Sequence, residues 1–308
     1  MNRGIVIKST GSRYKVLSED GQIYDCIIKG RFRVKGISTT NPVAVGDRVC
    51  FSEGDEKAAG VIRTIDERKN YIIRKSSNLS RQHQIMAANV DQVLLLVTLV
   101  MPRTHQEFID RFLATAEAYR IKTLIVFNKT DLYGPDEITI LNELISLYSG
   151  IGYECYPISV LKGDGTAAVA EALKDKISLV AGNSGTGKSS LLNRLNPDLN
   201  LRTEEISSCH EQGKHVTTFP EMHPMPFGGY VIDTPGIRGF GIADMDRNEI
   251  YHFFPEIFRK SKECKFHNCL HLNEPGCAVR EAIRTGEINI RRYRSYLNIL
   301  EDENRKYR

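Results

Sequence analysis

The most specific chemical signal in this sequence is a glycine-rich run between an apolar segment and a helical pattern. It follows Ile177–Ala181 and consists of Gly182, Asn183, Ser184, Gly185, Thr186, Gly187, Lys188, Ser189 and Ser190. A turn of this kind directs successive backbone N–H groups inward, where they bind phosphate oxygens. Its lysine reaches the β- and γ-phosphates, and the first hydroxyl residue after it binds Mg²⁺. We therefore predict a nucleotide phosphate site with Lys188 on the phosphates and Ser189 on the metal.

A second run follows the apolar segment Tyr230–Ile232 and contains Asp233, Thr234, Pro235 and Gly236. A carboxylate at the end of a strand beside a phosphate loop holds Mg²⁺ through water. We expect this role for Asp233, and we expect the N–H of Gly236 to contact the γ-phosphate. The pattern is common by itself, but here it lies directly after an apolar strand.

The bound base is indicated by four residues after the apolar segment Thr123–Phe127: Asn128, Lys129, Thr130 and Asp131. The Asp131 carboxylate can accept hydrogen bonds from guanine N1–H and the 2-amino group, and adenine offers neither donor. We expect Lys129 to lie along the base and ribose, and Asn128 to connect this run to the phosphate loop. Ser159 is a further candidate contact, to the guanine oxygen.

The order of these motifs is unusual, because Asp131 precedes Gly182 by 51 residues. In ordinary small GTPases the base-reading motif follows the phosphate loop. Chain order need not change the assembled pocket, since the strands can still lie side by side. A circular permutation explains all the motifs together, whereas the alternative treats the base-reading run as an ordinary turn.

A group of metal-binding residue types lies near the C-terminus. Cys264, Cys269 and Cys277 fall within fourteen residues, and the other four cysteines are scattered. In a cytosolic chain such a group indicates a metal rather than disulfides. With one histidine the set becomes Cys₃His, which suits tetrahedral Zn²⁺ in a structural role because no coordination position stays open. His271 and His267 are both candidates for the fourth ligand.

The elements that position these residues fall into three groups. The first is a small barrel, for which an OB-fold is the natural candidate, with strands expected at Arg3–Ser9, Tyr14–Leu17, Ile23–Ile28, Asp47–Phe51 and Gly60–Ile65. Within it, residues 29–35 alternate cations with apolar groups around Phe32, which suits either RNA or an edge strand protected by charge.

The second group alternates strands with helices and predicts a parallel, doubly wound sheet. Its expected strands and helices are Val93–Val100, Gln106–Tyr119, Thr123–Phe127, Glu137–Tyr148, Ile177–Ala181, Ser189–Leu195 and Tyr230–Ile232. The third group is helical and basic. In it, Asn289–Arg305 carries an apolar stripe that docks on its own domain, and the neighbouring Arg291, Arg292 and Arg294 are candidates for facing RNA.

Charge is distributed unevenly along the chain. Residues 1–86 hold 16 Lys and Arg against 9 Asp and Glu, whereas residues 87–239 hold 13 against 18. A basic N-terminal part suits a polyanion, and ordinary solvated surface charge is the alternative.

No apolar run reaches the roughly 18 residues of a membrane span. No secretory leader is evident at the N-terminus. We therefore expect a cytoplasmic protein without a membrane partner.

The order of the three nucleotide motifs, with the basic β-domain and the Cys/His group around them, resembles the ribosome-small-subunit-dependent GTPase A family. The resemblance covers the whole chain and includes Ala88–Gln92, Ile109–Arg111 and Glu274–Val279. It implies an N-terminal OB-fold, a permuted α/β P-loop GTPase domain and a C-terminal helical zinc domain, over residues 1–80, 85–240 and 241–308. It also implies His271 as the fourth zinc ligand.

The same resemblance implies a monomeric GTPase that binds the small ribosomal subunit and its rRNA, and assists late maturation of that subunit. GTP would be hydrolysed to GDP and phosphate with stimulation by the subunit. The alternatives are a nucleotide-gated RNA-binding module with little catalysis, and a GTP-dependent regulator with a protein or membrane partner.

Two residues depart from the usual patterns. Val216 stands in the first switch where a threonine is usual, so the threonine that binds Mg²⁺ is either Thr217 or Thr218. Ile237 stands where small GTPases place the glutamine that orients the attacking water. An aliphatic side chain cannot do this, and His215 is our candidate for the catalytic role.

Overall fold

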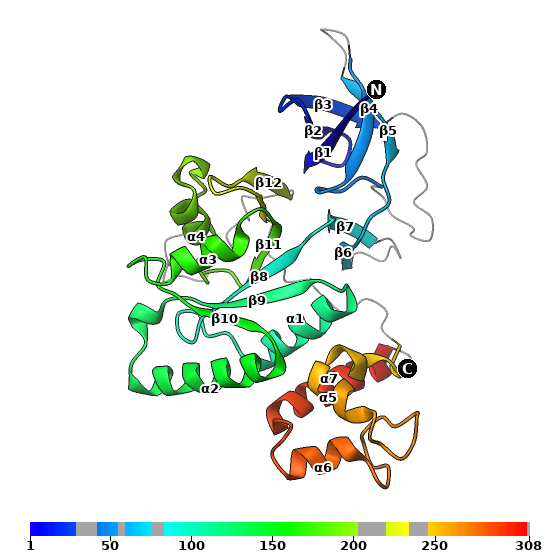
Figure 1. The fold of residues 1–308 in the computed structure, drawn as a ribbon, viewed down its shortest axis with the longest axis vertical. Helices are drawn as coiled ribbons and strands as arrows, with labels where there is room; N and C mark the ends of the chain where they lie inside the picture. Colours follow the sequence, from blue (N-terminus) through cyan, green and yellow to red (C-terminus); the bar gives the residue numbers. More distant parts are fainter. Residues whose placement is uncertain (29–41, 55–58, 76–82, 203–219, 234–245, 307–308) are drawn as a thin grey trace.

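The computed structural model describes residues 1–28, 42–54, 59–75, 83–202, 220–233 and 246–306. These residues form an N-terminal barrel, a central sheet with helices on both faces and a C-terminal group of helices (Figure 1). Continuous strand pairing joins the barrel to the central sheet. Within the described part of the chain, no helix is long and apolar enough to cross a bilayer.

The barrel consists of β1 (Asn2–Ser9), β2 (Tyr14–Ser18), β3 (Ile23–Ile28), β4 (Arg48–Ser52) and β5 (Gly60–Ile65). Their order is β1-β2-β3-β5-β4, and β4 pairs back onto β1 to close the barrel. The β3–β5 pair is parallel and the others are antiparallel. This arrangement confirms the expected OB-like barrel, and every predicted strand end is correct to within one residue. Residues 29–35 lie outside the described residues.

A two-stranded hairpin that was not predicted leads from the barrel into the central sheet. It pairs β6 (Tyr71–Lys75) with β7 (His83–Ala88), and Ala87 also forms a bridge with Val45 in the barrel. Asn89, directly after β7, fixes this connection through its side chain. Its amide oxygen accepts from the N–H of Lys69 at 3.0 Å, and its amide nitrogen donates to the carbonyl of Gly46 at 2.9 Å.

The central sheet has the strand order β10-β9-β8-β11-β13-β12. Its strands are β8 (Gln92–Val97), β9 (Lys122–Phe127), β10 (Glu154–Pro157), β11 (Ile177–Gly182), β12 (Glu221–Pro224) and β13 (Tyr230–Asp233). The prediction of a parallel sheet was wrong at β12, which runs antiparallel to β13. The predicted first strand was also too long: it ends at Val97, because Thr98 and Thr104 hydrogen-bond to each other and close a loop.

Both faces of the sheet are covered because successive strand residues point to opposite sides. Val93 and Leu95 pack toward α1 (Gln106–Ala118) and α2 (Pro135–Ile151). Leu94 and Leu96 pack toward α3 (Thr166–Leu173) and α4 (Lys188–Leu195) on the other face. Figure 1 shows these two helical layers on either side of the sheet. The buried face of α2 carries Leu141, Leu144 and Tyr148, whereas Ile138 is exposed.

The C-terminal part consists of η3 (Ile250–Phe253), α5 (Pro255–Ser261), α6 (Ala278–Arg284) and α7 (Ile290–Lys306). These elements share a core of their own, which includes Tyr296 and Leu300 of α7. The predicted apolar stripe of this last helix is therefore confirmed. Ala114 of α1 belongs to the same core, so the C-terminal helices pack directly on the central domain.

A buried ionic network fixes this packing. Arg292 of α7 is fully buried and contacts Asp110 of α1 at 2.9 Å and Glu256 of α5 at 2.7 Å. Ser295 and Tyr148 also donate hydrogen bonds to the Asp110 carboxylate. The expectation that the arginines of this helix face RNA is therefore wrong for Arg292, because its charge is satisfied inside the protein. Arg291 and Arg294 are exposed.

Candidate nucleotide and metal sites

The phosphate loop leaves the end of β11 and enters α4, in the strand–turn–helix context that the sequence predicted. Gly182, Gly185 and Gly187 all have positive φ angles. A side chain at Gly187 would place its Cβ 2.4 Å from the Asn128 amide nitrogen. Only glycine combines this backbone conformation with so close an approach to the base-reading residues.

Lys188, at the start of α4, turns its ammonium group back over the loop. Its Nζ donates to the carbonyls of Gly182 at 2.9 Å and Asn183 at 2.7 Å. The Thr186 hydroxyl donates to the same Asn183 carbonyl and closes the turn. The lysine charge is therefore held at the mouth of the loop, where phosphate oxygens would compete with the carbonyls for it.

The base-reading run is attached to the phosphate loop by Asn128, as expected from the sequence. This side chain is 2 % exposed, and its Nδ2 donates to the Thr186 carbonyl at 2.9 Å. Its Oδ1 accepts from the N–H of Val160 at 3.1 Å. One buried amide thus connects three segments that are far apart in the chain. The permuted motifs therefore form a single site.

Asp131 and Ser159 lie together beside this amide. The Ser159 hydroxyl donates to the Asp131 carboxylate at 2.5 Å and accepts from the N–H of Lys162 at 3.1 Å. Sequence reasoning placed Ser159 on the guanine oxygen, and that contact stays a prediction. In this structure its hydroxyl orients the carboxylate that would receive the guanine donors.

Two further positioning contacts were not found from the sequence. The Tyr133 hydroxyl donates to the Asn128 carbonyl at 2.6 Å and accepts from the N–H of Leu99 at 3.0 Å, which joins the ends of β8 and β9. Lys129 donates to the Met101 carbonyl. Burial lowers the pKa of Lys129, and the nearby Asp131 charge opposes that shift. Nothing in the sequence indicated that the hydroxyl of Tyr133, five residues after Asn128, would join these two strand ends.

The magnesium ligands predicted within the described residues are Ser189 and Asp233. Asp233 ends β13 opposite Val180 of β11, two residues before the phosphate loop begins. Ser189 lies in the first turn of α4. A hydroxyl and a carboxylate oxygen are the hard ligands that Mg²⁺ prefers, so the residue types fit this ion. His215, Thr217, Thr218, Gly236 and Ile237 lie outside the described residues.

The cysteine and histidine residues converge between α5 and α6. The ligand atoms of Cys264, Cys269, His271 and Cys277 all lie within 4.8 Å of one another. His271 Nδ1 is 3.6 Å from Cys264 Sγ and 3.5 Å from Cys277 Sγ, and these two sulfurs are 3.9 Å apart. The ligand atoms of a tetrahedral zinc ion are roughly 3.5–3.8 Å apart. The four residues therefore fit Zn²⁺.

The electrostatics of this group also suit a metal. Burial lowers the pKa of His271 to about 4, so its imidazole is neutral at neutral pH, as a metal ligand must be. Burial also raises the pKa of Cys269 to about 12. A thiolate at that position needs a neighbouring cation, which a bound metal supplies.

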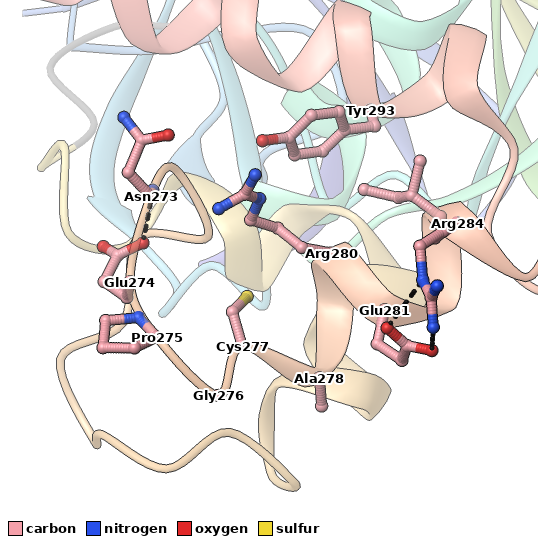
Figure 2. Close-up of a pocket in the computed structure, with 11 residues that line it drawn as sticks. Asn273, Glu274, Pro275, Gly276, Cys277, Ala278, Arg280, Glu281, Arg284 and Tyr293 are labelled. Carbon is pink, nitrogen blue, oxygen red and sulfur yellow. Dashed lines mark hydrogen bonds and ion pairs between the residues drawn. The ribbon is translucent and has the colours of Figure 1, made fainter.

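The loop that carries His271 is held by hydrogen bonds from both sides. The Glu274 carboxylate accepts from the N–H groups of Leu270, Leu272 and Asn273. Figure 2 shows the last of these contacts, on the loop that leads to Cys277. The Tyr293 hydroxyl donates to the His271 carbonyl at 2.6 Å. The spacing along α7 predicted that Tyr293 packs, but it gave no sign that its hydroxyl positions the metal loop.

Comparisons with known proteins identify the family. The model of the RsgA GTPase matches residues 65–243, and the model of the RsgA N-terminal domain matches residues 3–62. The chain belongs to the RsgA GTPase family. This confirms the family indicated by the motif order, and with it GTP hydrolysis as the activity.

RsgA proteins match the chain over its full length. The small ribosomal subunit biogenesis GTPase RsgA of Bacteroides fragilis is 56 % identical over 307 residues, covering 99 % of both chains. The RsgA of Christiangramia forsetii is 53 % identical and covers 99 % of this chain and 98 % of its own.

Two solved structures share the RsgA fold. The crystal structure of YjeQ from Thermotoga maritima has a TM-score of 0.79 at 38 % identity and covers 98 % of each chain. The structure of YloQ, described as a circularly permuted GTPase, has a TM-score of 0.76 at 31 % identity, covering 99 % of this chain and 95 % of the other. The permuted GTPase fold is thereby confirmed.

Proposed function

We propose that this GTPase binds the small ribosomal subunit and assists its late maturation, and that the subunit stimulates hydrolysis of GTP to GDP and phosphate. The observation that carries the proposal is the 56 % identity, over nearly the whole chain, to a protein named for small-subunit biogenesis. The protein would act in the cytoplasm as a monomer.

The N-terminal barrel is the part that we propose to bind rRNA. Residues 1–86 carry 16 basic against 9 acidic residues. A basic surface attracts the phosphate backbone and releases counterions, so binding should weaken steeply with added salt. We propose functional units at residues 1–80, 85–240 and 241–308, with the RNA-binding barrel first.

At the nucleotide site we propose that Asp131 reads guanine, with Lys129 beside the base and Ser159 holding the carboxylate. Asn128 keeps this group in register with the phosphate loop, as its bond to Thr186 supports. The remaining nucleotide contacts that we propose are Thr130, Gly182, Asn183, Ser184, Gly185, Gly187, Lys188, Ser190 and Gly236.

For hydrolysis we propose that Ser189, Asp233 and either Thr217 or Thr218 hold Mg²⁺, which neutralises charge on the β- and γ-phosphates when bound. We propose His215 as the residue that orients the attacking water, because Ile237 cannot. The C-terminal ligand set Cys264, Cys269, His271 and Cys277 would hold one structural Zn²⁺.

The test is GTP turnover with and without purified small subunits, with large subunits and ATP as controls. We expect turnover of GTP to rise when small subunits are added. Large subunits should not raise it, and turnover of ATP should not respond to either subunit. Turnover that is the same with either subunit would contradict the proposal. A His215→Ala variant that keeps the full turnover stimulated by small subunits would show that His215 does not orient the attacking water.

A further inference from the structure

The strand β12 lies between the nucleotide site and the barrel, and it pairs with both. On one edge Glu221 is opposite Asp233 of β13. On the other edge Glu221 is opposite Lys8 of β1. Directly opposed residues of neighbouring antiparallel strands point their side chains to the same face. The side chains of Asp233, Glu221 and Lys8 therefore form a row that runs from the magnesium site to the barrel.

The charges of this row depend on one another. Lys8 Nζ lies 2.8 Å from Glu221 Oε2, and the two side chains are 34 % and 36 % exposed. Like charges that lie directly opposite each other on a sheet repel. The ammonium group of Lys8 therefore offsets the repulsion between Glu221 and Asp233, and it comes from the other domain.

Apolar packing follows the same route. Met222 of β12 and Ile232 of β13 are 2 % and 0 % exposed and belong to one core cluster. Ile5 and Ile7 of the barrel strand β1 pack against that cluster. A packed core moves between discrete arrangements rather than deforming continuously. A displacement of β12 is therefore passed to β1.

We propose that β12 couples the nucleotide state to the position of the N-terminal barrel, and that the Lys8–Glu221 ion pair carries this coupling between the domains. The proposal rests on the magnesium role proposed above for Asp233. Lys8 and Glu221 act as positioning residues and touch no nucleotide. Because coupling is reciprocal, a polyanion that moves the barrel changes nucleotide affinity by the same factor.

The size of the effect follows from the exposure of the pair. Couplings between sites range from about 5-fold to 150-fold. A half-exposed ion pair contributes at the low end of this range. We therefore expect amide protection in β1 and β12, the strands on either side of the boundary, to differ about fivefold between the two nucleotide states.

The experiment is hydrogen–deuterium exchange of the full chain, saturated with Mg²⁺ and either GDP or a non-hydrolysable GTP analogue. The readout is the ratio of amide protection in β1 and β12 between the two states. We expect a ratio of about five in the unmodified protein. In Glu221→Gln, and separately in Lys8→Gln, we expect the ratio to fall below that of the unmodified protein with nucleotide still bound, while the apolar contacts of Ile5 and Ile7 remain.

Lys122→Gln is the matched control, because it also removes one lysine charge but breaks an ion pair with Glu154 between β9 and β10, at the opposite edge of the central sheet. This variant should keep the full ratio. A ratio of one in the unmodified protein, a full ratio in both test variants, or an equal loss in the control would each overturn the proposal. No ribosomal subunit is present in the assay, so failure of subunit stimulation and failure of this coupling are separate results.

Discussion

The central GTPase domain is joined to its two neighbours by contacts of different kinds. The joint to the C-terminal helices is a buried charged network around Arg292, which has no exposed side-chain surface. The joint to the barrel uses main-chain and amide hydrogen bonds at Asn89, together with the half-exposed Lys8–Glu221 pair. One joint places charges where water cannot replace a lost partner, and the other leaves its ion pair in contact with solvent.

This difference indicates which neighbour can respond to the nucleotide. Separating the C-terminal helices from α1 would leave the buried Asp110 carboxylate without Arg292 and the Ser295 hydroxyl, at a cost of several kcal/mol. At the barrel joint, rearranging the Lys8–Glu221 pair, whose side chains are 34 % and 36 % exposed, costs about 1 kcal/mol or less. The apolar contacts of Ile5 and Ile7 there must also adjust. The packing thus favours the barrel as the neighbour that responds to the nucleotide.

The largest effect is expected when a chelator removes the zinc that we propose for the C-terminal Cys/His group. Structural zinc contributes roughly 10 kcal/mol to the folding of small zinc domains. Cys269 and Cys277 belong to the same core as α7, so we expect amides of α5 to α7 to lose protection while the barrel strands keep theirs. Hydrogen exchange with and without the chelator measures this. An equal loss of amide protection over the whole chain would contradict the idea that the two joints are independent.

The next effect is that of Arg292→Ala. This change leaves two buried carboxylates, Asp110 and Glu256, without their cation, and should lower the free energy of unfolding by about 3–5 kcal/mol. Urea denaturation measures the difference. The exposed neighbour Arg291→Ala is the control and should change stability by less than about 0.5 kcal/mol. Equal effects for the two variants would show that the buried network does not stabilise this joint.

A smaller effect is expected for Asn89→Ala at the barrel joint. It removes the partners of the Lys69 N–H and the Gly46 carbonyl, and each group left unsatisfied costs about 1–3 kcal/mol unless water replaces the lost bond. We expect a loss near the lower limit, measured by denaturation, with the exposed Asn142→Ala as control. A loss as large as that of Arg292→Ala would remove the contrast between the joints.

The elements with strong local patterns were predictable from the sequence. The five barrel strands are short apolar-rich runs separated by glycine and charged residues, and the phosphate loop carries its own backbone requirements at Gly182 and Gly187. By contrast, β12 was missed because residues 221–224 contain one buried apolar residue and a proline. Its pairing with β13 and β1 depends on tertiary contacts that no local pattern records.

Polar positioning contacts were the least predictable part of the sites. Arg292 carries the same sequence signal as the exposed Arg291, and its partner Asp110 is 182 residues away in the chain. Ser159 was correctly associated with the base-reading run, but its hydrogen bond to Asp131 could not be deduced from spacing. Such contacts depend on where folded segments meet, so residue type and spacing identify the ligands but not the residues that orient them.

The central claim is that the permuted motifs build one guanine-specific site, and Asp131→Asn tests it most directly. The asparagine amide cannot accept both guanine donors, but it can accept from xanthine N1–H and donate to the 2-oxo group. Hydrogen bonds to charged groups contribute about 1.5–3 kcal/mol, which corresponds to roughly 10-fold to 100-fold in affinity. We therefore predict that Asp131→Asn loses affinity for GTP by this factor and gains affinity for xanthosine triphosphate. The control variant at the exposed Asp136, Asp136→Asn, should keep the preference for GTP. An Asp131→Asn protein that still prefers GTP would contradict the account.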